Sequence, residues 1–222
     1  MAIAINNWSE LSRSEQRSLL ERPAVADDGA IRAATADIVS QVREGGDDAL
    51  RELTKRYDGA DLDTLKVSDA EIAEAVTKLS KGQIAAIDLA IDNVRRFHEQ
   101  QRPRDIRVET MPGVVCERVS HALDSVGLYV PAGTAPLPSA ALMLAVPAAI
   151  AGCPTRILCT PPRSDGSADP AVLAAASRAD VSDIYKVGGA QAIAAMAYGT
   201  ESIPKVCKLF GPGNAWVTSA KT

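Results

Sequence analysis

Three residues with hydrogen-bonding side chains stand at positions where a parallel sheet would present them to a ligand. Tyr129, Gln191 and Asn214 each lie at or just after the end of a segment patterned like a β-strand. A phenol can stack or donate a hydrogen bond, and a side-chain amide can both donate and accept one, for example with a ribose or another amide. Turn formation and helix capping would also explain these residues, especially Asn214.

Loops rich in glycine or proline surround these three residues. They span residues 131–136, 188–191 and 211–214, and each precedes an expected helix start. Glycine lets a backbone approach a ligand closely, and the first N–H groups of a helix attract phosphate, so a nucleotide is the natural ligand class. The last loop is not a dinucleotide fingerprint, because Trp216 stands where the third glycine would be. Such loops also occur simply to make the turn, so the pattern predicts a nucleotide site of no standard type.

Alternating strands and helices in the second half of the chain would position these loops. Strands are expected at residues 125–130, 156–160, 182–187 and 205–210. Helices are expected at residues 139–150 (capped by Ser139), 170–178, 189–198 and after Asn214. This order predicts an α/β fold with a Rossmann-like parallel sheet, right-handed crossovers and flanking helices. Ligands bind such sheets beyond the carboxyl ends of the strands.

The first half of the chain is predicted to be helical and to end in a hairpin. The expected helices run from Ser12 to about Leu20, from Asp28 to Gly45-Gly46, from Asp47 to about Gly59, from Ser68 to Leu79, and from Gly82 past Phe97. Residues 106–119 alternate around a Met-Pro-Gly turn, which is typical of an antiparallel hairpin. We therefore divide the chain into a helical region, residues 1–122, and a Rossmann-like domain, residues 123–222.

Composition excludes several classes of protein. Hydrophobic residues make up 46% of the 222 residues and charged residues 23%, as in an ordinary globular protein. A net charge of -4 with no basic stripe argues against nucleic-acid binding. The longest apolar run is too short to span a bilayer, and residues 1–8 show no secretory pattern, so we expect a cytoplasmic protein.

Metal-binding and catalytic side chains are not evident. The four cysteines include no CxxC pair, and the only histidines, His98 and His121, are not at ligand spacing from one another or from a cysteine. We therefore assign no metal ligand and no catalytic acid or base to this chain.

Several longer motifs resemble one enzyme family. They are the segments VGLYVP (126–131), AVPAAIAGC (145–153), VGGAQAIAAMA (187–197), GTESIP (199–204) and FGPGN (210–214), together with Gly45-Gly46-Asp47 and the Tyr57-Asp58 pair. On these residues the chain is similar to histidinol dehydrogenase along its whole length.

The resemblance implies a function for the three candidate residues. Members of this family are cytoplasmic, zinc-dependent homodimers that oxidise L-histidinol through L-histidinaldehyde to L-histidine and reduce NAD. By resemblance, Tyr129, Gln191 and Asn214 would contact NAD. Ala132 stands where many members have glycine, with little expected effect.

Length is the main departure from the family. Members are roughly twice as long, and their zinc ligands and catalytic bases come after the position that corresponds to residue 222. The resemblance therefore implies that this chain carries the cofactor-binding half. The alternatives are a non-catalytic truncated or split product that only binds NAD or pairs with a separate second half, and a different NAD-dependent alcohol or aldehyde dehydrogenase.

Overall fold

The structure is a computed structural model that describes residues 5–20, 29–132 and 135–222. Its helical first part consists of a 3-10 turn, four helices and a hairpin, in the order η1 (Trp8–Glu10), α1 (Arg13–Leu20), α2 (Gly29–Asp58), α3 (Asp69–Thr77), α4 (Lys81–Glu99), β1 (Ile106–Met111) and β2 (Val114–Arg118). The second part alternates strands and helices, in the order β3 (Ser125–Tyr129), α5 (Pro138–Ile150), β4 (Thr155–Thr160), α6 (Pro170–Arg178), β5 (Asp183–Lys186), α7 (Gly189–Tyr198), β6 (Lys208–Phe210) and α8 (Ala215–Ala220).

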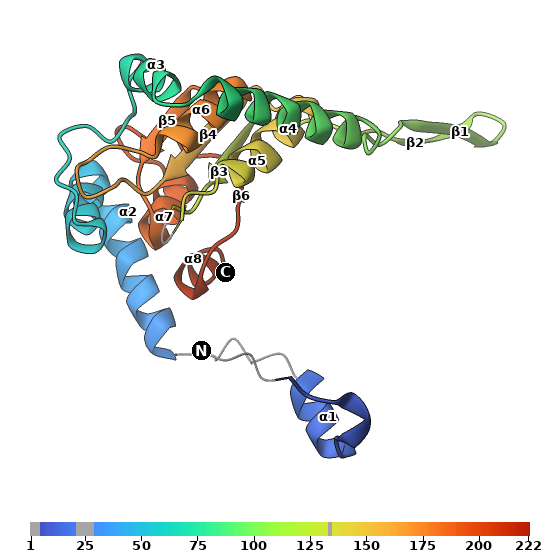
Figure 1. The fold of residues 1–222 in the computed structure, drawn as a ribbon. Coiled ribbons are helices and arrows are strands. Elements are labelled where there is room, and N and C mark those ends of the chain that lie inside the picture. Colours follow the sequence, from blue (N-terminus) through green and yellow to red (C-terminus); the bar gives the residue numbers. More distant parts are fainter. Residues whose placement is uncertain (1–4, 21–28, 133–134) are drawn as a thin grey trace.

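The predicted parallel sheet is confirmed. Its four strands lie in the order β5-β4-β3-β6, and every pairing within it is parallel. Helices cover the sheet on two sides (Figure 1). Strands β3 and β6 are parallel neighbours, so their carboxyl ends lie side by side at one edge of the sheet. A ligand at this edge can reach residues that follow both strands.

Alternation along the strands explains the two-sided core. Val126 and Leu128 belong to the cluster under α4, α5 and α6, whereas Tyr129 belongs to the cluster under α2 and α7. In β4, Leu158 and Cys159 divide between the two clusters in the same way. Successive strand residues point to opposite faces, so a sheet covered on both sides requires apolar residues at consecutive positions.

The first-part helices complete both layers. Helices α2, α7 and α8 pack together on one face, and α3 and α4 pack against α6 and α5 on the other. Both clusters thus draw on residues from before and after position 122, and the domain boundary stays a prediction. The hairpin β1–β2 projects beyond the end of α4 (Figure 1), and all its residues are exposed.

Helix starts show where sequence patterns were right and where they were wrong. The capping box of Ser68 and Glu71 is present as predicted. The box at Ser80 and Gln83 was missed, and α4 begins at Lys81 rather than after Gly82. Ser139 was predicted to cap α5, but the helix begins one residue earlier at Pro138, whose fixed φ suits a first helical position.

One strand start differs from expectation, and one predicted helix break is present. Strand β6 begins at Lys208, later than the predicted start at residue 205. The predicted break at the glycine pair is present: Gly46 has non-helical backbone angles (φ 52°, ψ -133°), so α2 consists of two helical segments that meet at a kink there. The predicted cap at Asp28 falls outside the described residues, as do residues 133–134 of the first glycine-containing loop. Among the described helices, none has the length and apolar content needed to cross a membrane.

Candidate functional site

A cavity of about 210 Å³ lies at the carboxyl edge of the sheet, between α2, α7 and α8. Its lining consists of Ile38, Tyr57, Asp58, Gly189, Ala190, Gln191, Asn214 and Trp216. Two of the three predicted site residues, Gln191 and Asn214, therefore meet in one cavity. The volume is below the range typical of sites that enclose a whole drug-sized ligand, so it suits one part of a nucleotide.

Tyr129 contacts the lining of this cavity through Gly189. It ends β3, is only 4% exposed, and its hydroxyl accepts a 3.0 Å hydrogen bond from the backbone N–H of Gly189. Burial raises the pKa of Tyr129, and the nearby Asp58 carboxylate adds to the increase, so the phenol stays protonated at neutral pH. In the described part of the chain its proton is not committed to an acceptor, so the hydroxyl can still donate.

Gln191 and Asn214 lie at the starts of two helices. Gln191 is in the first turn of α7 and is only 3% exposed, so its amide is held in place by the surrounding protein. Asn214 caps α8, and its Oδ1 accepts from the N–H of Val217 at 3.1 Å. The capping role anticipated for Asn214 is thus present, and the amide NH₂ remains available as a donor.

Glycine is required where β6 leaves the sheet. Gly211 has φ of 142°, and a Cβ there would lie 2.2 Å from the backbone oxygen of Tyr129. No other residue could pass so close to the end of β3, because a gap under 3.0 Å to backbone cannot be relieved by a side-chain movement. The close approach brings the start of α8, and Asn214 with it, next to the end of β3.

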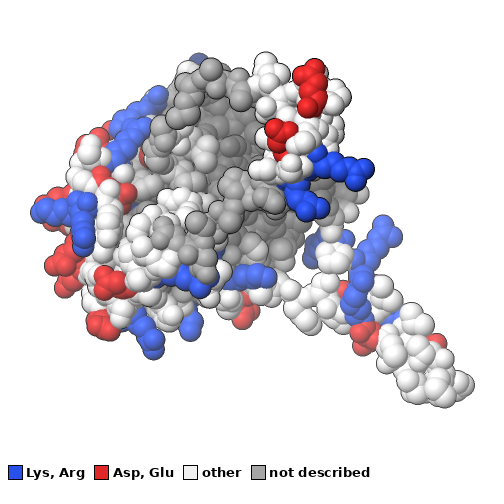
Figure 2. Space-filling model, turned by 90° about the horizontal axis from the view of Figure 1, so that it is seen from below, with Lys and Arg blue, Asp and Glu red and all other residues white. Residues whose placement is uncertain are grey.

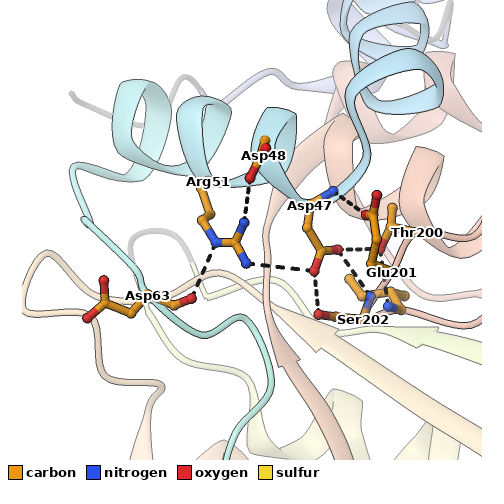
Figure 3. A network of polar contacts seen from close by, with 8 residues as sticks. Asp47, Asp48, Arg51, Asp63, Thr200, Glu201 and Ser202 are labelled. Carbon is orange, nitrogen blue, oxygen red and sulfur yellow. Dashed lines mark hydrogen bonds and ion pairs between the residues drawn. The ribbon is translucent and has the colours of Figure 1, made fainter.

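A polar network fixes the second half of α2 against the loop after α7 (Figure 3). The Asp47 carboxylate accepts from the Thr200 hydroxyl at 2.6 Å and from both the hydroxyl and the backbone N–H of Ser202. Glu201 accepts the N–H of Asp47 at 2.8 Å, which satisfies a donor that the kink at Gly46 leaves open. Gly46 has φ of 52°, and a Cβ there would collide with the Glu201 carboxylate.

The network also controls the charge of Asp47. Burial by itself would raise its pKa, but hydrogen bonds from Ser202 and Thr200, aided by Arg51, outweigh burial and hold the pKa below its ordinary value. Asp47 is therefore ionised and structural. It sets the position of the segment that ends in the cavity-lining Tyr57 and Asp58.

Asp58 is the site residue that sequence reasoning missed. It is the last residue of α2, and burial raises its pKa to about 6. The sequence singles out the Tyr57-Asp58 pair only as a family motif, and the Tyr57 side chain is 52% exposed. An acidic residue at a predicted helix C-terminus, where cations are favoured, was the available signal.

Metal-binding side chains do not gather near the cavity. Among the residues that the structure describes, no three or more His, Cys, Asp or Glu side chains could hold a metal ion together. His98 packs edge-on against Phe97 on α4, and His121 lines a separate apolar cavity of about 380 Å³ beside α5. Charged side chains of both signs are interspersed over the face shown in Figure 2.

Known proteins resemble this chain in sequence and in fold. The histidinol dehydrogenase family model matches residues 20–222. Histidinol dehydrogenase of Photobacterium profundum is 50% identical over 214 residues, which cover 96% of this chain and 47% of that protein. Histidinol dehydrogenase of Xanthomonas axonopodis pv. citri is 51% identical over 217 residues, 98% of this chain and 50% of that protein.

A solved structure agrees. The crystal structure of histidinol dehydrogenase from Elizabethkingia anophelis superposes with a TM-score of 0.89 at 40% identity, covering 95% of this chain and 48% of that one. The chain thus spans about half the length of the curated relatives it matches. With a family model that covers nearly the whole chain, and relatives that agree in sequence and fold, this chain belongs to the histidinol dehydrogenase family.

Proposed function

We propose that this chain carries the NAD-binding half of a histidinol dehydrogenase, with Tyr129, Gln191 and Asn214 contacting the cofactor. The observation that supports this most directly is the meeting of Gln191 and Asn214 in one cavity at the carboxyl edge of a parallel sheet. Family membership supplies the reaction class, since the relatives are named histidinol dehydrogenases.

The residues present fit a nucleotide. Gln191 and Asn214 offer amide groups, Tyr129 offers a phenolic proton, and the lining includes a buried carboxylate oxygen of Asp58 with no partner among the described residues. When bound, NAD accepts a hydride from the substrate. The task of these side chains is to hold and orient the cofactor.

The reaction proposed for the complete enzyme is the oxidation of L-histidinol through L-histidinaldehyde to L-histidine. We propose further that the enzyme is cytoplasmic, homodimeric and zinc-dependent. From the family resemblance, in which the zinc ligands and the catalytic base come later in the sequence, we place no zinc ligand and no catalytic base in this chain. The isolated 222-residue chain should accordingly bind NAD without oxidising histidinol. A screen of other alcohol and aldehyde substrates separates this proposal from a different NAD-dependent dehydrogenase, which would oxidise one of them.

Titration with NAD tests the proposal. Calorimetry on the purified chain should show saturable binding, and Gln191→Ala should weaken it about tenfold or more, because a polar group of the bound cofactor then lacks its partner. Gln41→Ala is the matched control, since Gln41 donates to its neighbour Asp37 on α2 and is not among the residues that line the cavity. Absence of NAD binding at millimolar concentration, or equal losses in both variants, would contradict the proposal.

An assay of turnover completes the test. The chain should form no NADH from L-histidinol with zinc supplied. Histidinol-dependent turnover would show that the base and the metal ligands lie among residues 1–222, contrary to the assignment made above.

A further inference from the structure

Asp58 has one carboxylate oxygen without a hydrogen-bond partner inside the candidate site. Oδ2 is shielded from solvent and lacks a partner among the residues that the structure describes. The residue lines the same cavity as Gln191 and Asn214. Buried polar atoms in folded proteins almost always have a partner, so an exception calls for an explanation.

A structural role does not explain this carboxylate. Asp58 is the last residue of α2, where the helix carries partial negative charge and cations are favoured. No cation in the described part of the chain pairs with it, and the guanidinium of Arg56 lies 5.2 Å from the ring centre of Tyr57 instead. The position therefore opposes the folded state, and its burial raises the pKa of the carboxyl to about 6.

The surroundings of Asp58 fix it in place. The network at Asp47 and Glu201 ties the start of this helical segment to the loop after α7, and α2 packs along α7 and α8. The free oxygen is thus held at a set position relative to Gln191, as an acceptor prepared before any ligand arrives.

The chemistry of the acceptor defines the donor. A carboxylate repels phosphate, so this end of the cavity is not the pyrophosphate position. It accepts hydrogen bonds from hydroxyl or N–H groups, and a cavity of about 210 Å³ has room for a sugar or one ring. A ribose offers two adjacent hydroxyls, which match the two oxygens of a carboxylate and need no accompanying cation.

We propose that Asp58 is a binding residue that accepts a hydrogen bond from a ribose hydroxyl of the bound nucleotide. The assignment rests on the proposed function and deepens it, because it names the part of the cofactor that this corner of the site recognises. Tyr129, whose pKa Asp58 also raises, would then stay protonated beside the sugar.

Binding of NAD by Asp58 variants tests this assignment. The chain has two tryptophans, and Trp216 lines the cavity, so its fluorescence in a Trp8→Phe background reports occupancy. Asp58→Ala should weaken NAD binding by about 10- to 100-fold, the range for a hydrogen bond to a charged group. Asp61→Asn is the matched control, since Asp61 is exposed and pairs with Lys55 at the surface.

Cofactor analogues identify the donor. Two forms of NAD that lack one 2′-hydroxyl, on the adenosine or on the nicotinamide ribose, are titrated into wild type and Asp58→Ala. One analogue should bind wild type more weakly than NAD does, but should bind the variant as tightly as NAD does. If Asp58 is merely structural, the ratio of the NAD affinity to the analogue affinity will be the same in both proteins. Equal losses for both analogues in both proteins overturn the ribose assignment.

The remaining outcomes separate this inference from the function on which it rests. If Asp58→Ala binds NAD as tightly as wild type does, the role of Asp58 is overturned and the proposed function still stands. No binding of NAD by wild type overturns both. Folding of the variant is not the obstacle, because the substitution removes a buried charge that has no partner in the described structure.

Discussion

Replacement of Asp58 by asparagine should stabilise the unliganded protein at neutral and alkaline pH. A rise in the carboxyl pKa from 3.8 to about 6 corresponds to about 3 kcal/mol against the charged form. Because part of the side chain reaches solvent, we discount this value to about 1–2 kcal/mol. Asparagine has nearly the same shape without the charge, so it should recover most of that amount.

The sign of the pH dependence follows from the raised pKa. The contribution of Asp58 to stability is fully present below its unfolded pKa and is lost as pH rises through about 6. Asp58→Asn should therefore exceed wild type in free energy of unfolding by about 1–2 kcal/mol at pH 8, and by much less at pH 4.5. For a chain of this size, that difference at pH 8 raises Tm by about 2–8 °C.

Urea unfolding followed by circular dichroism at both pH values measures the effect. Asp61→Asn is the control and should change stability by less than about 0.5 kcal/mol at either pH, because its ion pair with Lys55 is exposed. A destabilised Asp58→Asn protein at pH 8, or a difference that does not vary with pH, would show that the carboxylate is solvated or partnered and that our reasoning is wrong.

Three further predictions concern other parts of the molecule. Asp47→Ala should lower the free energy of unfolding by about 2–4 kcal/mol in urea at pH 7, and less near pH 3, since a carboxyl with a lowered pKa loses its contribution as pH falls; an equal loss at both values would contradict this. A native-state thiol titration should label exposed Cys116 and Cys207 quickly and leave Cys159 unlabelled, because burial raises the pKa of that thiol; rapid labelling of Cys159 would contradict its place in the core. Concentration-dependent self-association in size-exclusion chromatography should weaken in Val108→Lys, which adds charge to the exposed apolar hairpin, and an unchanged profile would exclude the hairpin as the contact surface.

Periodicity and turn residues were enough to predict the layered fold. Consecutive apolar positions in strands such as β4 indicate a sheet covered on both faces, and Gly188-Gly189 marks the turn into α7. Exact starts were less predictable, because competing caps lie close together. Helix α5, for instance, begins at Pro138 and is not capped by Ser139, since a proline at the first helical position has no backbone N–H that requires an acceptor.

The candidate site was predictable only where loop chemistry defines it. Gln191 and Asn214 follow strand ends, so a sequence pattern can find them. Asp58 comes from a distant helix, and it reaches the cavity only through tertiary packing of α2 on α7. The helix break at Gly46 is predictable from the glycine pair, but the close approach of Glu201 to Gly46 is a long-range contact that local patterns do not contain.

Two carboxylates on the same helical segment show how structure and function divide. Asp47 begins the segment after the kink, receives hydrogen bonds from Thr200 and Ser202, and has a lowered pKa. Asp58 ends it with an oxygen that lacks a partner among the described residues, and has a raised pKa. The first stabilises the fold and needs nothing further, whereas the second opposes folding until a donor arrives. A ligand that supplies the donor would therefore relieve the free-energy cost of burying the Asp58 carboxylate, and this relief would contribute to its binding. Asp47 anchors the start of the helical segment, and the segment in turn holds Asp58 in position for the ligand.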